Sequence, residues 1–257
     1  MIRHLLRVRH SLLRAFAVAA AVIATPLLTD AQRGQPAPPQ TPRAAAAIDL
    51  TGTWVSVIHE DWWLRMVTPR KGDYTNLLLT PAARKIADAW DPAKDEAAGE
   101  QCKGYGAAAI TRLPGRLRIS WQDDSTLKLE YEAGNQTRLF RFRAGPTAAA
   151  PAPAPSWQGV SVAEWRYTAV PPRSGELKVV TNHLRAGYLR KNGVPYTANA
   201  VLTEFYHRLA APNGDTWLTI VTEVTDPETM VQPFVLSTHF KKLPDGAAFT
   251  PEPCSAS

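Results

Sequence analysis

The sequence lacks the motifs from which several common catalytic sites are built. Its 257 residues include only two cysteines, too few for a thiolate zinc site, and no Cys-x-x-Cys pair. It has no Walker loop and no glycine-rich dinucleotide fingerprint, which excludes the usual nucleotide-binding loops. Beyond residue 31 it also lacks an apolar run long enough to cross a bilayer as a helix. These absences leave individual polar side chains, rather than known motifs, as candidates for a site.

The chain also has little excess of charge. Its formal net charge is +6, but four of the 29 basic residues and one of the 23 acidic residues precede residue 32, so 25 basic and 22 acidic residues remain. This balance argues against a nucleic-acid partner, which usually needs a strongly basic surface. With 45% apolar and 20% charged residues, the chain can bury a core and is not disordered overall.

The first 31 residues have the three parts of a secretory signal peptide. Four arginines precede an uncharged, mostly aliphatic run over residues 15–29, and residues 29–31 (Thr-Asp-Ala) place small residues before a cut at Gln32. The alternative, an uncleaved membrane anchor, is less favoured because 15 residues fall short of the roughly 20 that a spanning helix needs. We therefore expect an exported chain, periplasmic rather than secreted, with no stable membrane insertion after cleavage.

The two cysteines are expected to pair. Cys102 and Cys254 are an even pair, and in an oxidising compartment such a pair is more often a disulfide than two free thiols. Cys254 is the fourth residue from the end of the sequence, so a bridge there would hold a tail that otherwise frays.

Two proline- and alanine-rich segments divide the chain. Residues 32–47 are predicted to be a disordered spacer after the signal peptide, and residues 144–156 form a second such stretch. We interpret the second as a long loop within one domain over residues 48–257, because each half alone makes only a modest core. Two small β domains joined by a linker are the alternative.

The hydrophobic pattern predicts an all-β fold. Apolar residues alternate with polar ones over many short segments, which is typical of an antiparallel meander closing into a barrel of about 8–10 strands. One short helix is predicted over residues 81–90, with Thr80 as its N-cap and Pro92 as its stop. The predicted strands cover residues 117–121, 127–131, 136–143, 157–168, 176–183, 198–208, 216–224 and 234–242.

One hairpin allows a register to be predicted. Asn213-Gly214 is a strong two-residue turn signal, and a turn there pairs Pro212 with Asp215 and His207 with Ile220. One face of the hairpin then carries the charged side chains and the other, expected to face the interior, does not. The polar and aromatic residues assigned to this inner face are Thr203, Phe205, His207 and Thr222.

Two segments resemble lipocalin-like barrels. Residues 49–54 (Asp-Leu-Thr-Gly-Thr-Trp) resemble the Leu-x-Gly-Thr-Trp start of these barrels, and residues 218–242 look like the closing strands of exported bacterial proteins thought to be lipocalin-like. The resemblance implies that Trp54 plugs one end of the barrel and that a basic residue of the last strand, Lys241 or Lys242, lies over it. It also implies binding of small apolar molecules.

The candidate ligand-binding residues are those expected in the barrel lumen. They are His207, Thr203, Phe205, Thr222, Trp54 and Trp121. A histidine among apolar neighbours could orient a ligand. The alternative is a structural core histidine whose hydrogen bond is made to a neighbouring hydroxyl.

No metal or other cofactor is predicted. His59-Glu60-Asp61-Trp62-Trp63 begins like the zinc-protease helix motif, but Trp63 stands where that motif requires histidine. We interpret it as a polar turn flanked by aromatic residues. A metal site would need three of the four histidines beyond residue 31 to converge, and no fixed spacing supports that. These histidines are His59, His183, His207 and His239.

Three functions remain open from the sequence. The favoured one is an exported lipocalin-like barrel that binds a small apolar or amphipathic molecule in its lumen. A structural or interaction protein of the cell envelope with no small ligand is one alternative. The other is a barrel-based hydrolase or isomerase that uses His207 as acid or base with Asp61 or Glu164 as its partner. The oligomeric state is left open.

Overall fold

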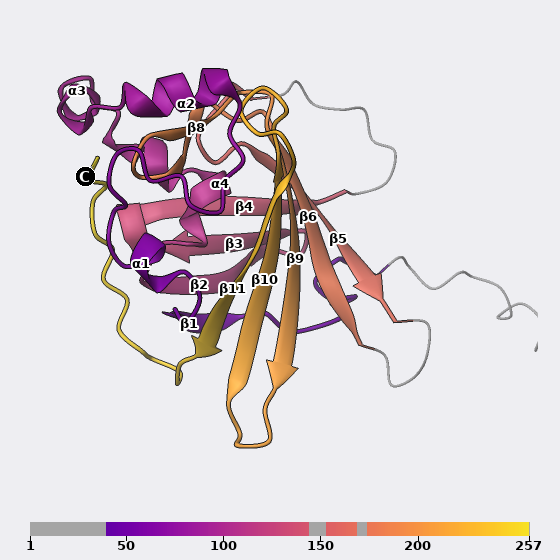
Figure 1. The fold of residues 1–257 in the computed structure, drawn as a ribbon. Coiled ribbons are helices and arrows are strands. Elements are labelled where there is room, and N and C mark those ends of the chain that lie inside the picture. The colour runs from indigo at the N-terminus through magenta and orange to yellow at the C-terminus, as the bar shows by residue number, and fades with distance from the viewer. Residues whose placement is uncertain (1–39, 144–152, 169–173, 257) are drawn as a thin grey trace, which may run out of the picture. The chain divides into compact units, whose positions relative to one another are not determined.

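A computed structural model describes residues 40–143, 153–168 and 174–256. The predicted signal peptide lies outside these residues, as does most of the loop predicted over residues 144–156. Within them, nine strands form one closed barrel, which confirms the predicted all-β class (Figure 1).

The barrel strands follow one another around the barrel in the order β1-β11-β10-β9-β6-β5-β4-β3-β2. Their bounds are β1 Gly52–Val57, β2 Arg116–Asp123, β3 Thr126–Tyr131, β4 Gln136–Phe142, β5 Val160–Tyr167, β6 Gly175–Asn182, β9 Val201–Ala210, β10 Thr216–Thr225 and β11 Phe234–Lys242. All neighbouring pairs are antiparallel except β4 and β5. This exception corrects the predicted meander, because β4 and β5 begin at the same end of the barrel.

A second group of elements lies outside the barrel sheet. It contains a two-stranded ribbon and several short helices, grouped near one end of the strands (Figure 1). These elements are β7 Gly187–Arg190, β8 Val194–Tyr196, α1 Trp62–Arg65, α2 Pro81–Asp88, α3 Pro92–Ala97, α4 Ala107–Ile110 and the 3-10 turns η1 Gln101–Tyr105 and η2 Ala133–Asn135. No helix within the described ranges is both long and apolar enough to span a membrane.

The predicted helix is α2, and its start is as expected. The Thr80 hydroxyl accepts a hydrogen bond from the Ala83 backbone N–H. On this helix Ile86 is exposed, and the small Ala83 and Ala87 face the interior. Pro92 does not simply stop the helix: it is the first residue of α3, since proline fits a first helical turn.

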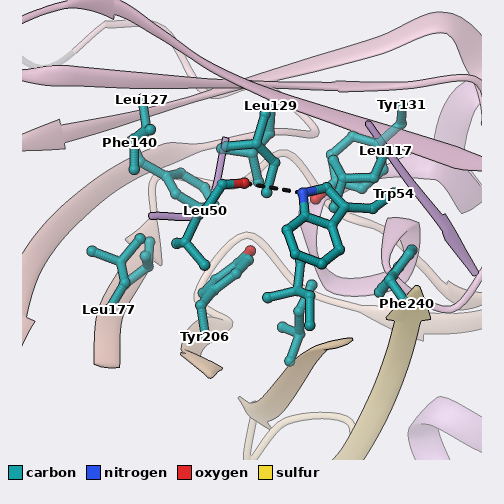
Figure 2. Close-up of a cluster of buried hydrophobic side chains, with 14 of the residues drawn as sticks. Leu50, Trp54, Leu117, Leu127, Leu129, Tyr131, Phe140, Leu177, Tyr206 and Phe240 are labelled. Atoms are coloured by element: carbon teal, nitrogen blue, oxygen red, sulfur yellow. Dashed lines mark hydrogen bonds between the residues drawn. The ribbon is translucent and has the colours of Figure 1, made fainter. Parts of the chain in front are cut away.

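The barrel interior is filled with side chains. Trp54 is fully buried, and its indole N–H donates to the Leu50 carbonyl at 3.0 Å (Figure 2). Lys242 of β11 pairs with Trp54 of β1 and holds its ammonium 5.7 Å from the indole ring centroid. Trp54 is thus a buried residue of the barrel core, with a basic residue of the last strand near its ring. Around them pack Leu117, Leu127, Leu129, Phe140, Leu177, Tyr206, Leu218, Ile220 and Phe240.

The predicted register of the β9–β10 hairpin is wrong by one residue. His207 pairs with Thr219, and the closing pair is Ala211 with Asp215, whose carbonyl accepts the Ala211 N–H at 2.8 Å. A two-residue turn would need this hydrogen bond from Pro212, which has no N–H. The loop therefore has three residues, and Gly214, at φ 87°, supplies the left-handed conformation that such loops end on.

The end of the predicted spacer contacts the barrel. The indole N–H of Trp165 donates to the Pro42 carbonyl at 2.8 Å, and the Arg43 N–H donates to the Asp124 carbonyl at 3.0 Å. Residues 40–47 thus lie against strand β5 and the β2–β3 turn.

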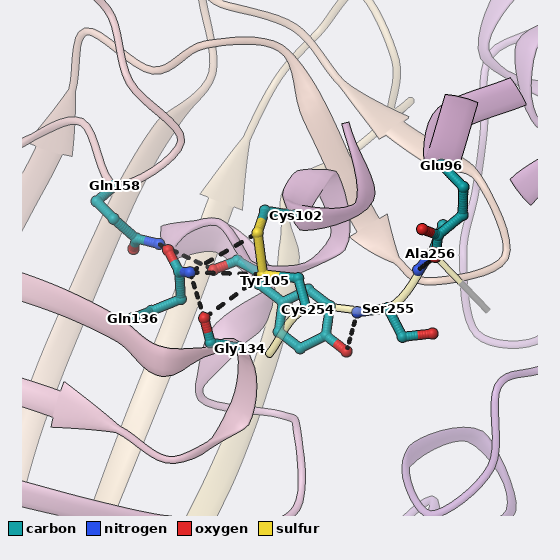
Figure 3. The surroundings of a disulfide bond; sticks show 9 residues. All are labelled: Glu96, Cys102, Tyr105, Gly134, Gln136, Gln158, Cys254, Ser255 and Ala256. Carbon is teal, nitrogen blue, oxygen red and sulfur yellow. Dashed lines mark hydrogen bonds between the residues drawn. A yellow bond between two sulfur atoms is a disulfide. The ribbon is translucent and has the colours of Figure 1, made fainter. Parts of the chain in front are cut away.

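The two cysteines form the predicted disulfide. Cys102 in η1 is bonded to Cys254 in the C-terminal segment, with a Cα–Cα distance of 5.2 Å (Figure 3). Tyr105 packs beside it and accepts a hydrogen bond from the Ser255 N–H at 3.2 Å. Gly134, at φ 70°, allows Tyr105 to pack closely against the backbone, because a Cβ at this position would lie 2.4 Å from the Tyr105 ring. The bridge therefore fixes the C-terminal segment against η1 and η2.

Candidate functional site

The structure places three of the six predicted ligand-binding residues in the interior and three outside. Trp54 and Thr222 are fully buried, and Trp121 is partly buried and stacks on Phe142 with ring centroids 5.7 Å apart. The three that face outward are Thr203, Phe205 and His207.

The inward orientation predicted for His207, Thr203 and Phe205 is wrong. The shifted register turns this side of β9 outward, because neighbouring positions of a strand face opposite sides of the sheet. The His207 side chain is 37% exposed, and its Nε2 lies 3.4 Å from Glu176. Its carboxylate contact is thus Glu176, where the sequence favoured Asp61 or Glu164.

The residues that take the inward positions of β9 include a buried carboxylate. Glu204 is fully buried and pairs with Arg138, which is 1% exposed. Arg138 Nη1 donates to Glu204 Oε1 at 2.9 Å, and Nη2 donates to Oε2 at 2.5 Å and to Thr181 at 3.2 Å. The Tyr206 hydroxyl donates to the same carboxylate at 3.1 Å. This network is enclosed in the core and anchors the barrel rather than offering a binding surface.

The electrostatics of this pair are balanced. Burial alone would lower the pKa of Arg138, but the charge of Glu204 and its hydrogen bonds outweigh burial and raise that pKa. Arg138 therefore stays charged inside the barrel, where the Glu204 carboxylate accepts its hydrogen bonds.

A cavity outside the barrel lumen offers a different kind of site. It has a volume of about 420 Å³, within the range of small-molecule pockets. Six parts of the chain form its walls: α1 and the segment after it, the end of η1, the segment from α4 to β2, η2 with the residue before it, the end of β7, and the C-terminal segment. Its lining includes the arginines Arg65, Arg112 and Arg190.

These three arginines are buried at the junction of the walls. Their residues are 6%, 5% and 3% exposed, in the order Arg65, Arg112 and Arg190. Arg65 Nε donates to the Arg112 carbonyl at 3.0 Å, and Arg112 Nη1 donates to the Leu189 carbonyl at 3.1 Å. The first two arginines thereby fasten α1 and the α4–β2 segment to β7.

Arg190 differs from the other two. All three nitrogens of its guanidinium are buried and have no hydrogen-bond partner among the described residues. Burial lowers the pKa of Arg190, while Asp61 and Asp73 oppose this from a distance. A buried guanidinium without partners is costly, and natural structures rarely keep such a group without a use for it.

The cluster carries more positive than negative charge. Burial, followed by the positive charges of Arg190 and Arg65, lowers the pKa of Arg112 to about 9, while Asp61 acts in the opposite direction. A pKa of about 9 leaves Arg112 protonated at neutral pH. Glu60 contacts Arg65, with 3.6 Å between Oε2 and Nη1, whereas Arg112 and Arg190 form no ion pair among the described residues. An anion in the cavity would therefore gain most from Arg112 and Arg190.

No protein-family model matches the chain, and searches of curated proteins and of solved structures found none significantly similar to it.

The cavity also has an apolar side. Leu64 and Leu113 contribute to its lining, and Met66 and Val67, which follow α1, are 56% and 67% exposed at its edge. Exposed aliphatic side chains beside buried arginines make an amphipathic site, in which a charged group and a hydrocarbon group of one molecule are both accommodated.

The C-terminal segment forms one wall of the cavity. Thr250, Glu252 and Pro253 line it, directly before the disulfide at Cys254. The Thr250 N–H donates to Glu132 Oε1 at 2.7 Å, so the carboxylate of Glu132, which also lines the cavity, is hydrogen-bonded to the C-terminal segment. The disulfide and this bond together hold the wall in place.

Sequence reasoning missed the arginine cluster. Arg112 and Arg190 each follow apolar stretches, but single arginines beside apolar residues are common and carry no spacing signal. The three come from segments far apart in the chain, and only the closed barrel with its outer elements brings them together. Trp62 and Trp63, in the segment interpreted as a polar turn, lie on the short helix α1 and are both exposed.

Proposed function

We propose that this protein binds a small anion that carries an apolar part, in the cavity formed by α1, the α4–β2 segment, β7 and the C-terminal segment. The anionic group, a carboxylate or a phosphate, is held by Arg190 together with Arg65 and Arg112. The apolar part lies toward Met66 and Val67. This keeps the small, partly apolar ligand predicted from the sequence but moves it out of the barrel lumen.

The observation that carries the proposal is the buried guanidinium of Arg190 without a hydrogen-bond partner in the described part of the chain. A guanidinium presents several donors in a planar fork that matches a carboxylate or a phosphate. Two further buried arginines on the same cavity increase the positive potential there. An anion would satisfy the donors and reduce the repulsion among the three charges.

We further propose that the protein is an exported, periplasmic member of the lipocalin-like barrels. The closed nine-stranded barrel and the position of Lys242 over Trp54 support the likeness. The disulfide supports an oxidising compartment, since such bonds persist outside the reducing cytosol.

Isothermal titration with a matched pair of probes tests the binding proposal. Decanoate and 1-decanol share the hydrocarbon chain but differ in charge, and both are used below the concentrations at which they aggregate. We expect decanoate to bind at least about tenfold more tightly, because a hydrogen bond to a charged group contributes about 1.5–3 kcal/mol.

The control compares two arginine variants. Arg190→Met should remove the preference for decanoate, while Arg208→Met, the same change at an exposed position near the end of β9, should keep it. Equal affinity for the two probes in the wild-type protein, or equal losses in the two variants, would show that the cavity does not select an anion through Arg190.

A further inference from the structure

Three side chains with metal-binding chemistry converge at the edge of the barrel. His59 and Glu60 follow β1, and His239 lies on β11. Since β1 and β11 are paired with Val57 opposite His239, the second and third residues past β1, His59 and Glu60, come close to His239. The sequence predicted no metal site because histidines so far apart have no recognisable spacing, and the pairing of the first and last strands supplies the missing proximity.

The distances among the three side chains suit a small metal ion. His239 Nδ1 lies 2.8 Å from Glu60 Oε1, and His59 Nε2 lies 3.1 Å from the same oxygen. All three ligand atoms fall within 4.8 Å of one another. Zinc bonds of about 2.0–2.1 Å in a tetrahedron place neighbouring ligand atoms about 3.3 Å apart. The His59 side chain is 56% exposed, so it is free to close the remaining gap.

Two atoms of the group have unmet bonding capacity. His239 Nδ1 and Glu60 Oε2 are buried and without a hydrogen-bond partner in the described ranges. The contact between His239 and Glu60 is close but is not a hydrogen bond. Arg65 Nη1 lies 3.6 Å from Glu60 Oε2, which holds the carboxylate with its other oxygen toward the histidines.

We propose that His59, Glu60 and His239 form a binding site for a divalent transition-metal ion, with Zn²⁺ as the expected occupant. Imidazole nitrogens and one carboxylate oxygen are the ligands of many zinc sites, and this set leaves a fourth position for water or a substrate. The ligands include no thiolate, because both cysteines are in the disulfide. The proposal stands independently of the anion cavity.

Titration of the full, untagged chain with Zn²⁺ tests the site. The protein is first treated with a chelator, which is then removed, and binding is followed by isothermal titration calorimetry. We expect one ion per chain at this site. The variants His59→Ala, Glu60→Gln and His239→Ala should each weaken binding at least about 100-fold, since loss of a direct ligand exceeds the 10–100-fold cost of losing an outer partner.

His207→Ala is the matched control. His207 also lies beside a glutamate on the outer face of the barrel, but its group contains only one histidine. This variant should bind Zn²⁺ like the wild type. Far-ultraviolet circular dichroism of every variant shows whether a loss of binding comes from unfolding.

Cobalt substitution gives a second readout. Co²⁺ in the same site should produce the visible absorption of a four-coordinate ion, and His239→Ala should abolish it in a folded protein. The proposal is overturned if the wild type binds no Zn²⁺, or if the three ligand variants, correctly folded, bind it as the wild type does. It is also overturned if His207→Ala weakens binding as much as they do.

Discussion

Replacing Arg138 with methionine is expected to destabilise the protein by about 3–5 kcal/mol, because the change leaves the carboxylate of Glu204 buried without its partner. Both side chains are inside the barrel, where water cannot take the place of the guanidinium. The same substitution on the exposed Arg208 should change stability by no more than about 0.5 kcal/mol. Urea unfolding followed by tryptophan fluorescence measures both.

A double variant distinguishes the cost of an unpaired buried charge from the cost of lost packing around the pair. Arg138→Met combined with Glu204→Leu removes both charges and fills the space with apolar atoms, so most of the lost stability should return. Methionine alone keeps the buried carboxylate, whereas the double variant has no buried charge at this position. A double variant as unstable as Arg138→Met would mean that packing around the pair, and not the unpaired charge, causes the loss.

Removing the disulfide is the second large effect. The bond joins residues 152 positions apart, and the chain-entropy model gives an upper value of about 5 kcal/mol for so long a loop. We expect the variant with both Cys102→Ser and Cys254→Ser to lose about 2–5 kcal/mol of unfolding free energy. Urea unfolding of this variant, beside the oxidised and the reduced wild type, provides the measurement.

The same variant should also bind decanoate less tightly. The C-terminal segment lines the arginine cavity with Thr250, Glu252 and Pro253, and without the bridge this wall is held mainly by its hydrogen bonds to Glu132. Binding is compared in buffer without urea, where the variant is still folded. If the double serine variant is as stable as the oxidised wild type and binds decanoate equally well, the disulfide neither stabilises the fold nor shapes the cavity.

Much of the fold follows from local patterns in the sequence. The alternation of apolar residues predicts eight of the nine barrel strands within one to a few residues, because a strand with one buried face must repeat every second residue. The start of α2 follows from a capping threonine before a proline. The position of Trp54 follows from the resemblance of residues 49–54 to lipocalin-like barrels.

The error on β9 has a specific cause. Predicting the inner face by excluding charge placed Glu204 outside, yet Glu204 is buried because Arg138, on a strand far away in the sequence, neutralises it. Arg138 lies two residues before the buried Phe140, on the same face of β4. A lone charge is excluded from a core, but a pair from two strands is not, and one strand alone cannot reveal its partner.

Neither candidate site was predictable from local patterns in the sequence. The arginine cavity combines α1, the α4–β2 segment and β7, and the proposed metal site combines the end of β1 with β11. Both depend on contacts between segments that the closure of the barrel brings together. Their residue types are visible in the sequence, but their proximity is a property of the fold.

The most direct test of the central claim is urea unfolding of wild type and Arg190→Met, each with and without decanoate. Without the probe, we predict that Arg190→Met is as stable as the wild type or more stable by about 1–4 kcal/mol, because a buried unpartnered charge is replaced by an apolar side chain of similar size. With decanoate at about 100 times its dissociation constant, the wild type should gain about 2.7 kcal/mol and the variant much less. A variant that is several kcal/mol less stable without the probe, and that gains as much as the wild type with it, would contradict the claim that Arg190 is kept for an anion.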